Sequence, residues 1–253
     1  MLNGTPDANT HQKAATDTPV KPIRRSIADG NVALDEKTCD TAVGPRLPGR
    51  EPARPVQRPP PCSDTSPWPC SCQAATDELK RLAGLGVKAI KLHPHTQKFD
   101  IADPKVRALC KLAGELGVAV LFDNFNIVPG DSQHLFNLAV QLPKTHFIFA
   151  HMGGMDFRFW NSLFMARTAK DFFFDNIHFD ISATAVLVAD SPLEAEFVWT
   201  IRNVGIDNVM LGSDYPQLSL KQAVDALEKL DLTEEEKRKI RWDNANRLFG
   251  DKR

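Results

Sequence analysis

The pattern of hydrophobic and polar positions changes near residue 74. Beyond it, amphipathic segments alternate with short, almost wholly apolar runs, which is typical of successive β-α units around a parallel sheet. We expect strands at 87–92, 118–122, 146–150, 177–181 and 208–211, and helices at 76–85, 104–116, 131–141, 158–168, 192–203 and 220–230. A helix capped by Thr233 and a short helix at 244–249 are expected to follow. The pattern therefore predicts an α/β fold with five parallel strands.

The N-terminal segment of the chain lacks this alternating pattern. Residues 1–72 hold twelve of the 18 prolines and show almost no apolar periodicity. Such a segment cannot bury enough apolar surface to offset the entropy lost on ordering. We predict a disordered segment over 1–72 and a folded domain over 73–253. Docking of the proline run 59–61 to an aromatic groove, as a polyproline helix, is the alternative.

Composition and charge limit the classes of binding partner that we expect. With 31 Lys and Arg against 32 Asp and Glu, the net charge of −1 gives no field that favours nucleic acid or an anionic membrane. The apolar runs are far shorter than the roughly 20 residues that cross a bilayer, and no signal peptide is recognisable. The five cysteines are odd in number, which argues against a disulfide framework. We expect a soluble, cytoplasmic protein with a small-molecule substrate, compatible with a homo-oligomer.

Polar residues follow each predicted strand. In a barrel of parallel strands the active site lies at the carboxyl ends of the strands, where these residues would converge. Histidines and carboxylates gathered there can hold a divalent cation, which lowers the pKa of a bound water to near 7. The candidates are His93 and His95, Asp123 and Asn124, His151, Asp180, and Asp214.

Each candidate also has a structural interpretation. His151 alone after a strand is as well explained by a hydrogen-bonded structural histidine, and Asp214 or Asp180 by a turn cap. His93 and His95 would face one ion if the strand continued through them, but Pro94 makes a loop equally compatible.

Four segments resemble one family. Residues 86–94, 149–154, 211–216 and 244–250 are similar to the fourth-strand, sixth-strand, eighth-strand and terminal-helix motifs of the amidohydrolase-related family, over about residues 86–250. The family includes decarboxylases of carboxymuconate-semialdehyde type and related barrel hydrolases. The resemblance implies a (β/α)8 TIM barrel of the metal-dependent hydrolases, of which strands four to eight are recognisable here.

The resemblance also implies roles. His151 would contact the metal or polarise its water, and Asp214 would be a metal ligand or the general base. The resemblance implies zinc as the metal. Asp123 stands where the family has a metal-binding histidine, and because carboxylates favour harder cations, manganese is the alternative. We expect His151, Asp214 and Asp123 as metal ligands, His151 and Asp214 as catalytic residues, and His93, His95 and Asn124 as substrate-binding residues.

The front of the barrel departs from the family. An H-x-H pair normally ends the first strand, whereas residues 1–72 contain only His11 and lack three apolar strands. Truncation, a misassembled reading frame or completion by a second chain would each account for this. We predict a metal-dependent hydrolase of a small organic substrate, in which a metal-activated water attacks the scissile bond. The alternatives are a non-oxidative decarboxylase using the same site, and a catalytically inactive relative that acts as a binding module.

Overall fold

The computed structural model describes residues 31–33, 71–168 and 175–250. Within them a single parallel sheet runs in the order β1-β2-β3-β4-β5-β6, which is also the order of the chain. The strands are β1 (Asn31–Ala33), β2 (Ala89–Leu92), β3 (Ala119–Phe122), β4 (Phe147–Phe149), β5 (Ile177–Asp180) and β6 (Val209–Met210). The five expected strands are confirmed, each inside its expected range. The short strand β1 is an addition, in the segment for which the sequence predicted no fold; residues 1–30 and 34–70 lie outside the described residues.

Helices connect the strands. They are α1 (Ser71–Gly84), α2 (Pro94–Gln97), α3 (Pro104–Glu115), α4 (Asp131–Gln141), η3 (Ala150–Asn161), α5 (Ser162–Thr168), α6 (Thr184–Val188), α7 (Glu194–Val204), η4 (Ile206–Asn208), α8 (Leu220–Lys229), α9 (Glu234–Arg238), η5 (Lys239–Asp243) and α10 (Asn244–Phe249). In the described part of the chain, none of these helices combines the length and the apolar character that a bilayer-spanning segment needs.

Two expected helices differ from those observed. The helix expected at 76–85 begins at Ser71, because nothing between Pro69 and Gly84 breaks it. The helix expected at 158–168 is instead the 3-10 segment η3 followed by the short helix α5. The backbone from His151 to Gly154 has positive φ, so a regular helix cannot start there.

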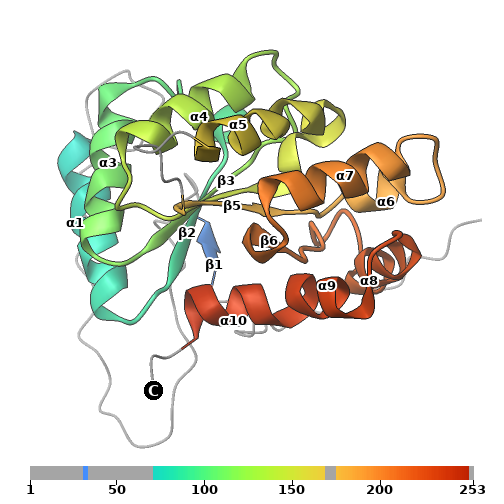
Figure 1. Ribbon diagram of the computed structural model, residues 1–253. Helices are drawn as coiled ribbons and strands as arrows, with labels where there is room; N and C mark the ends of the chain where they lie inside the picture. Colours follow the sequence, from blue (N-terminus) through green and yellow to red (C-terminus); the bar gives the residue numbers. More distant parts are fainter. Residues whose placement is uncertain (1–30, 34–70, 169–174, 251–253) are drawn as a thin grey trace, which may run out of the picture.

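The outer face of the sheet forms the main core. Its side chains, among them Ile90, Val120, Phe149 and Phe179, are buried against the helices. Helices α1, α3, α4, α5 and α7 follow one another around this face (Figure 1). Successive side chains of a strand point to opposite faces of the sheet. The residues between those buried under the helices therefore point to the inner face.

The inner face carries a smaller apolar cluster. Ala89, Ala119, Ile148 and Met210 come from four strands and are buried there. Leu248, Phe249 and Ala245 of α10 pack against them, so the last helix covers part of the inner face. Towards the carboxyl ends of the strands the inner face becomes polar, and the candidate functional residues lie there.

Candidate active site

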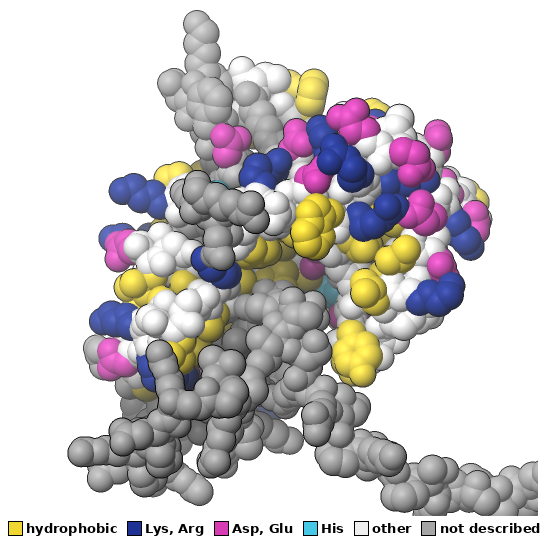
Figure 2. Space-filling view, turned by 90° about the horizontal axis from the view of Figure 1, so that it is seen from below, with side chains coloured by type: hydrophobic (Ala, Val, Ile, Leu, Met, Phe, Trp, Pro, Cys, Tyr) yellow, Lys and Arg dark blue, Asp and Glu magenta, His cyan; other side chains and the backbone are white. Residues whose placement is uncertain are grey.

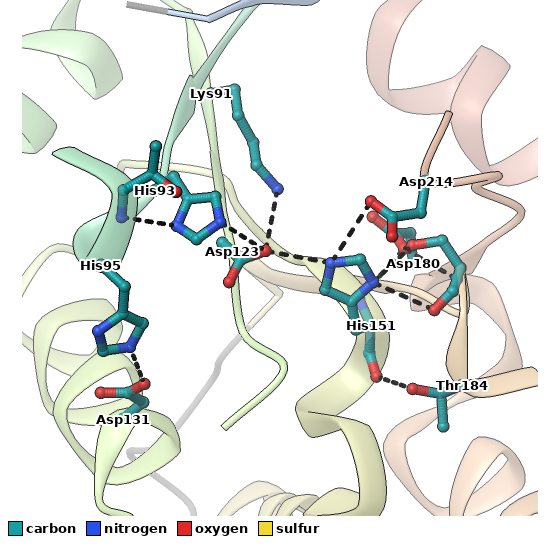
Figure 3. A network of polar contacts seen from close by, with 11 residues as sticks. Lys91, His93, His95, Asp123, Asp131, His151, Asp180, Thr184 and Asp214 are labelled. Atoms are coloured by element: carbon teal, nitrogen blue, oxygen red, sulfur yellow. Dashed lines mark hydrogen bonds and ion pairs between the residues drawn. The ribbon is translucent and has the colours of Figure 1, made fainter. Parts of the chain in front are cut away.

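The structure brings four of the expected residues into one row. Asp123 follows β3, His151 follows β4 and Asp214 follows β6, and parallel strands place these positions at one rim. Asp123 Oδ1 lies 3.1 Å from His151 Nε2 and 3.7 Å from His93 Nε2, while His151 Nε2 lies 3.9 Å from Asp214 Oδ1 (Figure 3). The contacts therefore run from His93 through Asp123 and His151 to Asp214.

His151 is fixed on both sides of its ring. Its backbone has φ 61°, a left-handed conformation that costs a residue other than glycine about 1–3 kcal/mol. Its backbone N–H donates to Asp180 Oδ1 at 3.2 Å, and its carbonyl accepts from Thr184 Oγ1 at 2.6 Å. The ring atom Nδ1 lies 3.2 Å from the carbonyl oxygen and 3.0 Å from the hydroxyl of Ser182. These contacts hold the ring so that Nε2 faces Asp123 and Asp214.

Asp180 is the centre of this support. Besides His151, its Oδ1 accepts hydrogen bonds from the backbone N–H and the hydroxyl of Ser182. Asp180 thus closes a turn, as its structural interpretation predicts, but the same carboxylate also holds His151. Gly212 packs beside it, where a Cβ atom would lie 3.0 Å from Asp180 Cγ.

The glycines after His151 are required by close packing. A Cβ atom on Gly154 would lie 2.4 Å from the carbonyl oxygen of Phe125, a distance that real Cβ atoms do not reach. The Phe125 ring itself lies against the imidazole of His151, with 5.5 Å between ring centroids. The glycine pair therefore allows the loop after β3 to close over one side of the histidine.

The charges of the two central groups are coupled. Burial would raise the pKa of Asp123, but the hydrogen bond with His151 and the charges of Lys91 and His93 lower that pKa to about 2. Burial would lower the pKa of His151, yet its hydrogen bond to Asp123 and the negative charge of Asp180 raise it above the ordinary value. An ionised Asp123 therefore stabilises a proton on His151.

Lys91 belongs to the cluster, although it was not among the residues predicted from the sequence. Its Nζ lies 3.8 Å from Asp123 Oδ1, and only 23% of its side chain is exposed. The period-2 alternation of β2 places Lys91 on the same side of the strand as His93, and this was the signal that could have identified it. Ser182 and Thr184 were missed as well, and no local motif marks them.

Two expected residues lie apart from the row. His95 Nε2 contacts Asp131 Oδ2 at 2.7 Å, and its ring centroid is 6.5 Å from that of His93. Because α2 begins at Pro94, the two histidines leave the strand geometry and face different carboxylates. Asn124 is 1% exposed, and its Oδ1 accepts a hydrogen bond from Ser132 in α4. Their role in binding substrate stays a prediction.

The donor chemistry of the row fits a divalent cation. Such sites combine carboxylate oxygens with neutral imidazole nitrogens, and both are present. Burial lowers the pKa of His93, so its imidazole is neutral at pH 7 and offers a lone pair. In the arrangement observed, no three His, Cys, Asp or Glu side chains of the described residues surround a single point, because the contacts form a row. The metal ligands predicted from the sequence therefore stay a prediction.

Comparison with known families adds to this geometry. Residues 58–250 match the model of a family described as Amidohydrolase. The chain belongs to the amidohydrolase family. This confirms the resemblance seen in the sequence, and the match begins before residue 86, inside the Pro-rich segment. No curated protein is detectably similar to the chain in sequence.

Solved structures share the fold. A 2,6-dihydroxybenzoate decarboxylase from Rhizobium is 20% identical, with a TM-score of 0.52 over 71% of this chain and 68% of that one. A dihydroxybenzoic acid decarboxylase from Polaromonas sp. JS666, with bound manganese and the inhibitor 2-nitroresorcinol, is 19% identical, with a TM-score of 0.53 over 71% and 66% of the chains. A proposed 2-pyrone-4,6-dicarboxylic acid hydrolase from Pseudomonas putida is 19% identical, with a TM-score of 0.51 over 69% and 67%.

These likenesses confirm the fold class. The chain has the α/β architecture of the TIM-barrel amidohydrolases, and it spans about two thirds of the length of the three structures. At such low identity the comparison concerns the fold and leaves the reaction open.

Proposed function

We propose that this chain is a metal-dependent, non-oxidative decarboxylase of a small aromatic carboxylic acid. The observation that carries the proposal is the buried pair Asp123–His151 at the strand ends, with Asp214 facing the same imidazole nitrogen. Two of the similar structures named above are decarboxylases of dihydroxybenzoic acids, and one of them contains manganese. The sequence favoured hydrolysis, but these relatives support the decarboxylase alternative better.

Asp123, Asp214 and His93 are the residues that would hold the cation. His151 cannot both ligate a metal and carry a proton through Nε2, and in this scheme it keeps the proton, because Nε2 lies 3.1 Å from Asp123 Oδ1, within hydrogen-bond distance. When bound, a divalent cation would supply positive charge that stabilises the negative charge of the substrate. Manganese is the first metal to test, because an aspartate in place of a histidine favours a harder cation than zinc.

His151 would supply the proton of the reaction. Decarboxylation of an aromatic acid requires a proton on the ring carbon that carries the carboxylate, after which the carbon–carbon bond breaks and carbon dioxide leaves. The protonated imidazole would give up its Nε2 proton to that carbon and recover one from water. Asp123 and Asp180 would stabilise the imidazolium between turnovers. Figure 2 shows histidine and acidic side chains next to hydrophobic ones, a combination that suits an aromatic ring bearing polar groups.

Hydrolysis is the second candidate. His151 Nε2 and Asp214 Oδ1 lie 3.9 Å apart, so Asp214 is placed to accept a proton from a water molecule bound beside both groups. The similarity to the proposed 2-pyrone-4,6-dicarboxylic acid hydrolase points in the same direction.

The test is a product assay with the full chain and added manganese. With 2,6-dihydroxybenzoate we expect release of carbon dioxide and resorcinol, and His151→Gln should lower the rate by about 100-fold or more. His134→Gln, on an exposed position of α4, is the matched control and should leave the rate unchanged. Opening of a pyrone dicarboxylate without carbon dioxide release would favour hydrolysis, and a chain inactive in both assays would contradict the proposal.

Metal content gives an independent measurement. Elemental analysis should find near-stoichiometric manganese or zinc in the wild type, and much less in Asp214→Ala and Asp123→Ala. A folded wild type that binds no divalent metal would rule out the metal-dependent mechanism and favour the interpretation as a binding module.

A further inference from the structure

Lys91 presents a positive charge to the candidate active site. It lies in β2 on the face of Ala89, which belongs to the inner apolar cluster, so its side chain starts from the inner face of the sheet. Its ammonium is 3.8 Å from Asp123 Oδ1, longer than the 2.7–3.2 Å typical of a hydrogen bond. Asp123 thus attracts the ammonium without using its three N–H donors, which stay available to another acceptor.

Other cations near the domain surface are engaged elsewhere. Arg158 binds both oxygens of Glu196 at 2.5 and 2.6 Å. Arg202 likewise binds both oxygens of Glu236. Within the residues that the structure describes, Lys91 is the only Lys or Arg that forms an ion pair with Asp123, Asp180 or Asp214.

The carboxylates of this site oppose the binding of an anionic substrate. Three carboxylates, those of Asp123, Asp180 and Asp214, lie along the rim, and each repels a negatively charged ligand. The imidazole nitrogens Nε2 of His151 and His93 both lie towards Asp123 Oδ1, at 3.1 and 3.7 Å. The proposed cation would offset part of this charge, and Lys91 adds a second positive charge whose N–H donors are free for a carboxylate oxygen.

We propose that Lys91 binds the carboxylate of the substrate and so selects small organic anions over neutral molecules. This inference rests on the proposed function, because it assigns the group that recognises the acid to be decarboxylated. The ammonium would donate to a carboxylate oxygen from the inner face, beside the Asp123–His151 pair shown in Figure 3. Lys91 is a specificity residue in this scheme, and the proton transfer stays with His151.

The test separates recognition of the carboxylate from recognition of the ring. Binding of 2,6-dihydroxybenzoate and of resorcinol, the same ring without the carboxylate, is measured by calorimetry with the manganese-loaded full chain. Lys91→Met keeps the apolar stem and removes the charge, Lys91→Arg keeps the charge, and Lys111→Met removes a 69% exposed lysine on α3 as the matched control. We expect Lys91→Met to bind the acid about tenfold or more weakly, with resorcinol binding unchanged. Lys91→Arg should retain part of the affinity for the acid, and Lys111→Met all of it.

The outcomes separate this inference from the proposed function. Equal loss of both ligands in Lys91→Met, or no loss of the acid, would show that Lys91 only balances the charge of Asp123, and would overturn the inference. Binding of the acid that depends on Lys91, without carbon dioxide release, would support the inference and contradict decarboxylation. A wild type that binds neither ligand would overturn both.

Discussion

At the scale of single residues, backbone strain marks the candidate site. His151 and Asp214 both have positive φ, at 61° for each, and both stand directly after or close to the end of a strand. A residue other than glycine persists in this conformation only when its surroundings hold it there. For His151 the surroundings are Asp180 at the end of β5, and Ser182 and Thr184 just after it. Left-handed backbone also occurs at Lys98 and Asp190, so the strain at His151 supports a functional role only together with these contacts.

The charge of Asp180 has a measurable consequence for His151. Burial opposes a proton on the imidazole, while the hydrogen bond with Asp123 and the charge of Asp180 favour it and raise the pKa. Asp180→Asn keeps a similar shape but removes the charge, so the pKa of His151 should fall below its wild-type value. Titration of the imidazole by NMR on metal-free protein measures this shift. Asp225→Asn, an exposed acid on α8, should leave the pKa of His151 unchanged; an equal pKa in Asp180→Asn would show that the carboxylate acts only as a turn cap.

At this scale the sequence predicted those site residues that follow the end of a strand. His151, Asp123 and Asp214 each follow an apolar run, so their convergence could be expected from the rule for parallel strands. Asn124 follows the same run as Asp123, but neighbouring residues point to opposite sides, and it turns to Ser132 instead. The contacts of Asp180 and Ser182 with His151 span about 30 positions of the chain, and no local pattern encodes them.

At the scale of elements, regular helices were predictable and the segment after β4 was not. Helices α4 and α10 have the expected bounds, because their apolar spacing defines them locally. Thr233 caps α9 through a capping box with Glu236, as its sequence indicated. Segment η3 instead takes left-handed turns at His151 and Met152, a conformation that residues other than glycine rarely adopt. Tertiary contacts with the loop after β3 decide its conformation.

Two glycines test this explanation of η3. Gly154→Ala would place a Cβ atom 2.4 Å from the carbonyl oxygen of Phe125, at a backbone φ of 58°, so it should lower the free energy of unfolding by about 2 kcal/mol or more. Gly84→Ala, at the end of α1, meets nothing within 4 Å and should be neutral or stabilising by up to about 1 kcal/mol. Urea unfolding of both variants gives the comparison. Equal stability of the two would show that the loop after β3 does not require the close approach at Gly154.

At the scale of the whole molecule, the chain has a parallel sheet with two differently covered faces. The helices bury the outer face, as short, wholly apolar strands predicted. The sequence predicted only strands four to eight of a barrel. The structure adds β1 beside β2, with Asn31 opposite Ala89, and places α10 against the inner face. Neither feature was predictable, because a three-residue strand has no detectable period and the terminal-helix motif does not say which face it covers.

The position of α10 predicts that the end of the chain stabilises the entire sheet. Phe249 is half-buried and packs on the inner cluster formed by residues of β2, β3, β4 and β6, so truncating it would remove apolar contacts with this cluster. Phe249→Ala should therefore lower the free energy of unfolding by about 2 kcal/mol, in one cooperative transition measured by circular dichroism. Trp242→Ala removes a larger ring from the preceding segment η5, but this ring is 66% exposed, and the change should stay within about 0.5 kcal/mol. A loss of stability in Phe249→Ala as small as that in Trp242→Ala would contradict this prediction, and so would unfolding of α10 in a separate transition. In either case α10 would not stabilise the sheet, and the inner face would have to be stabilised in another way.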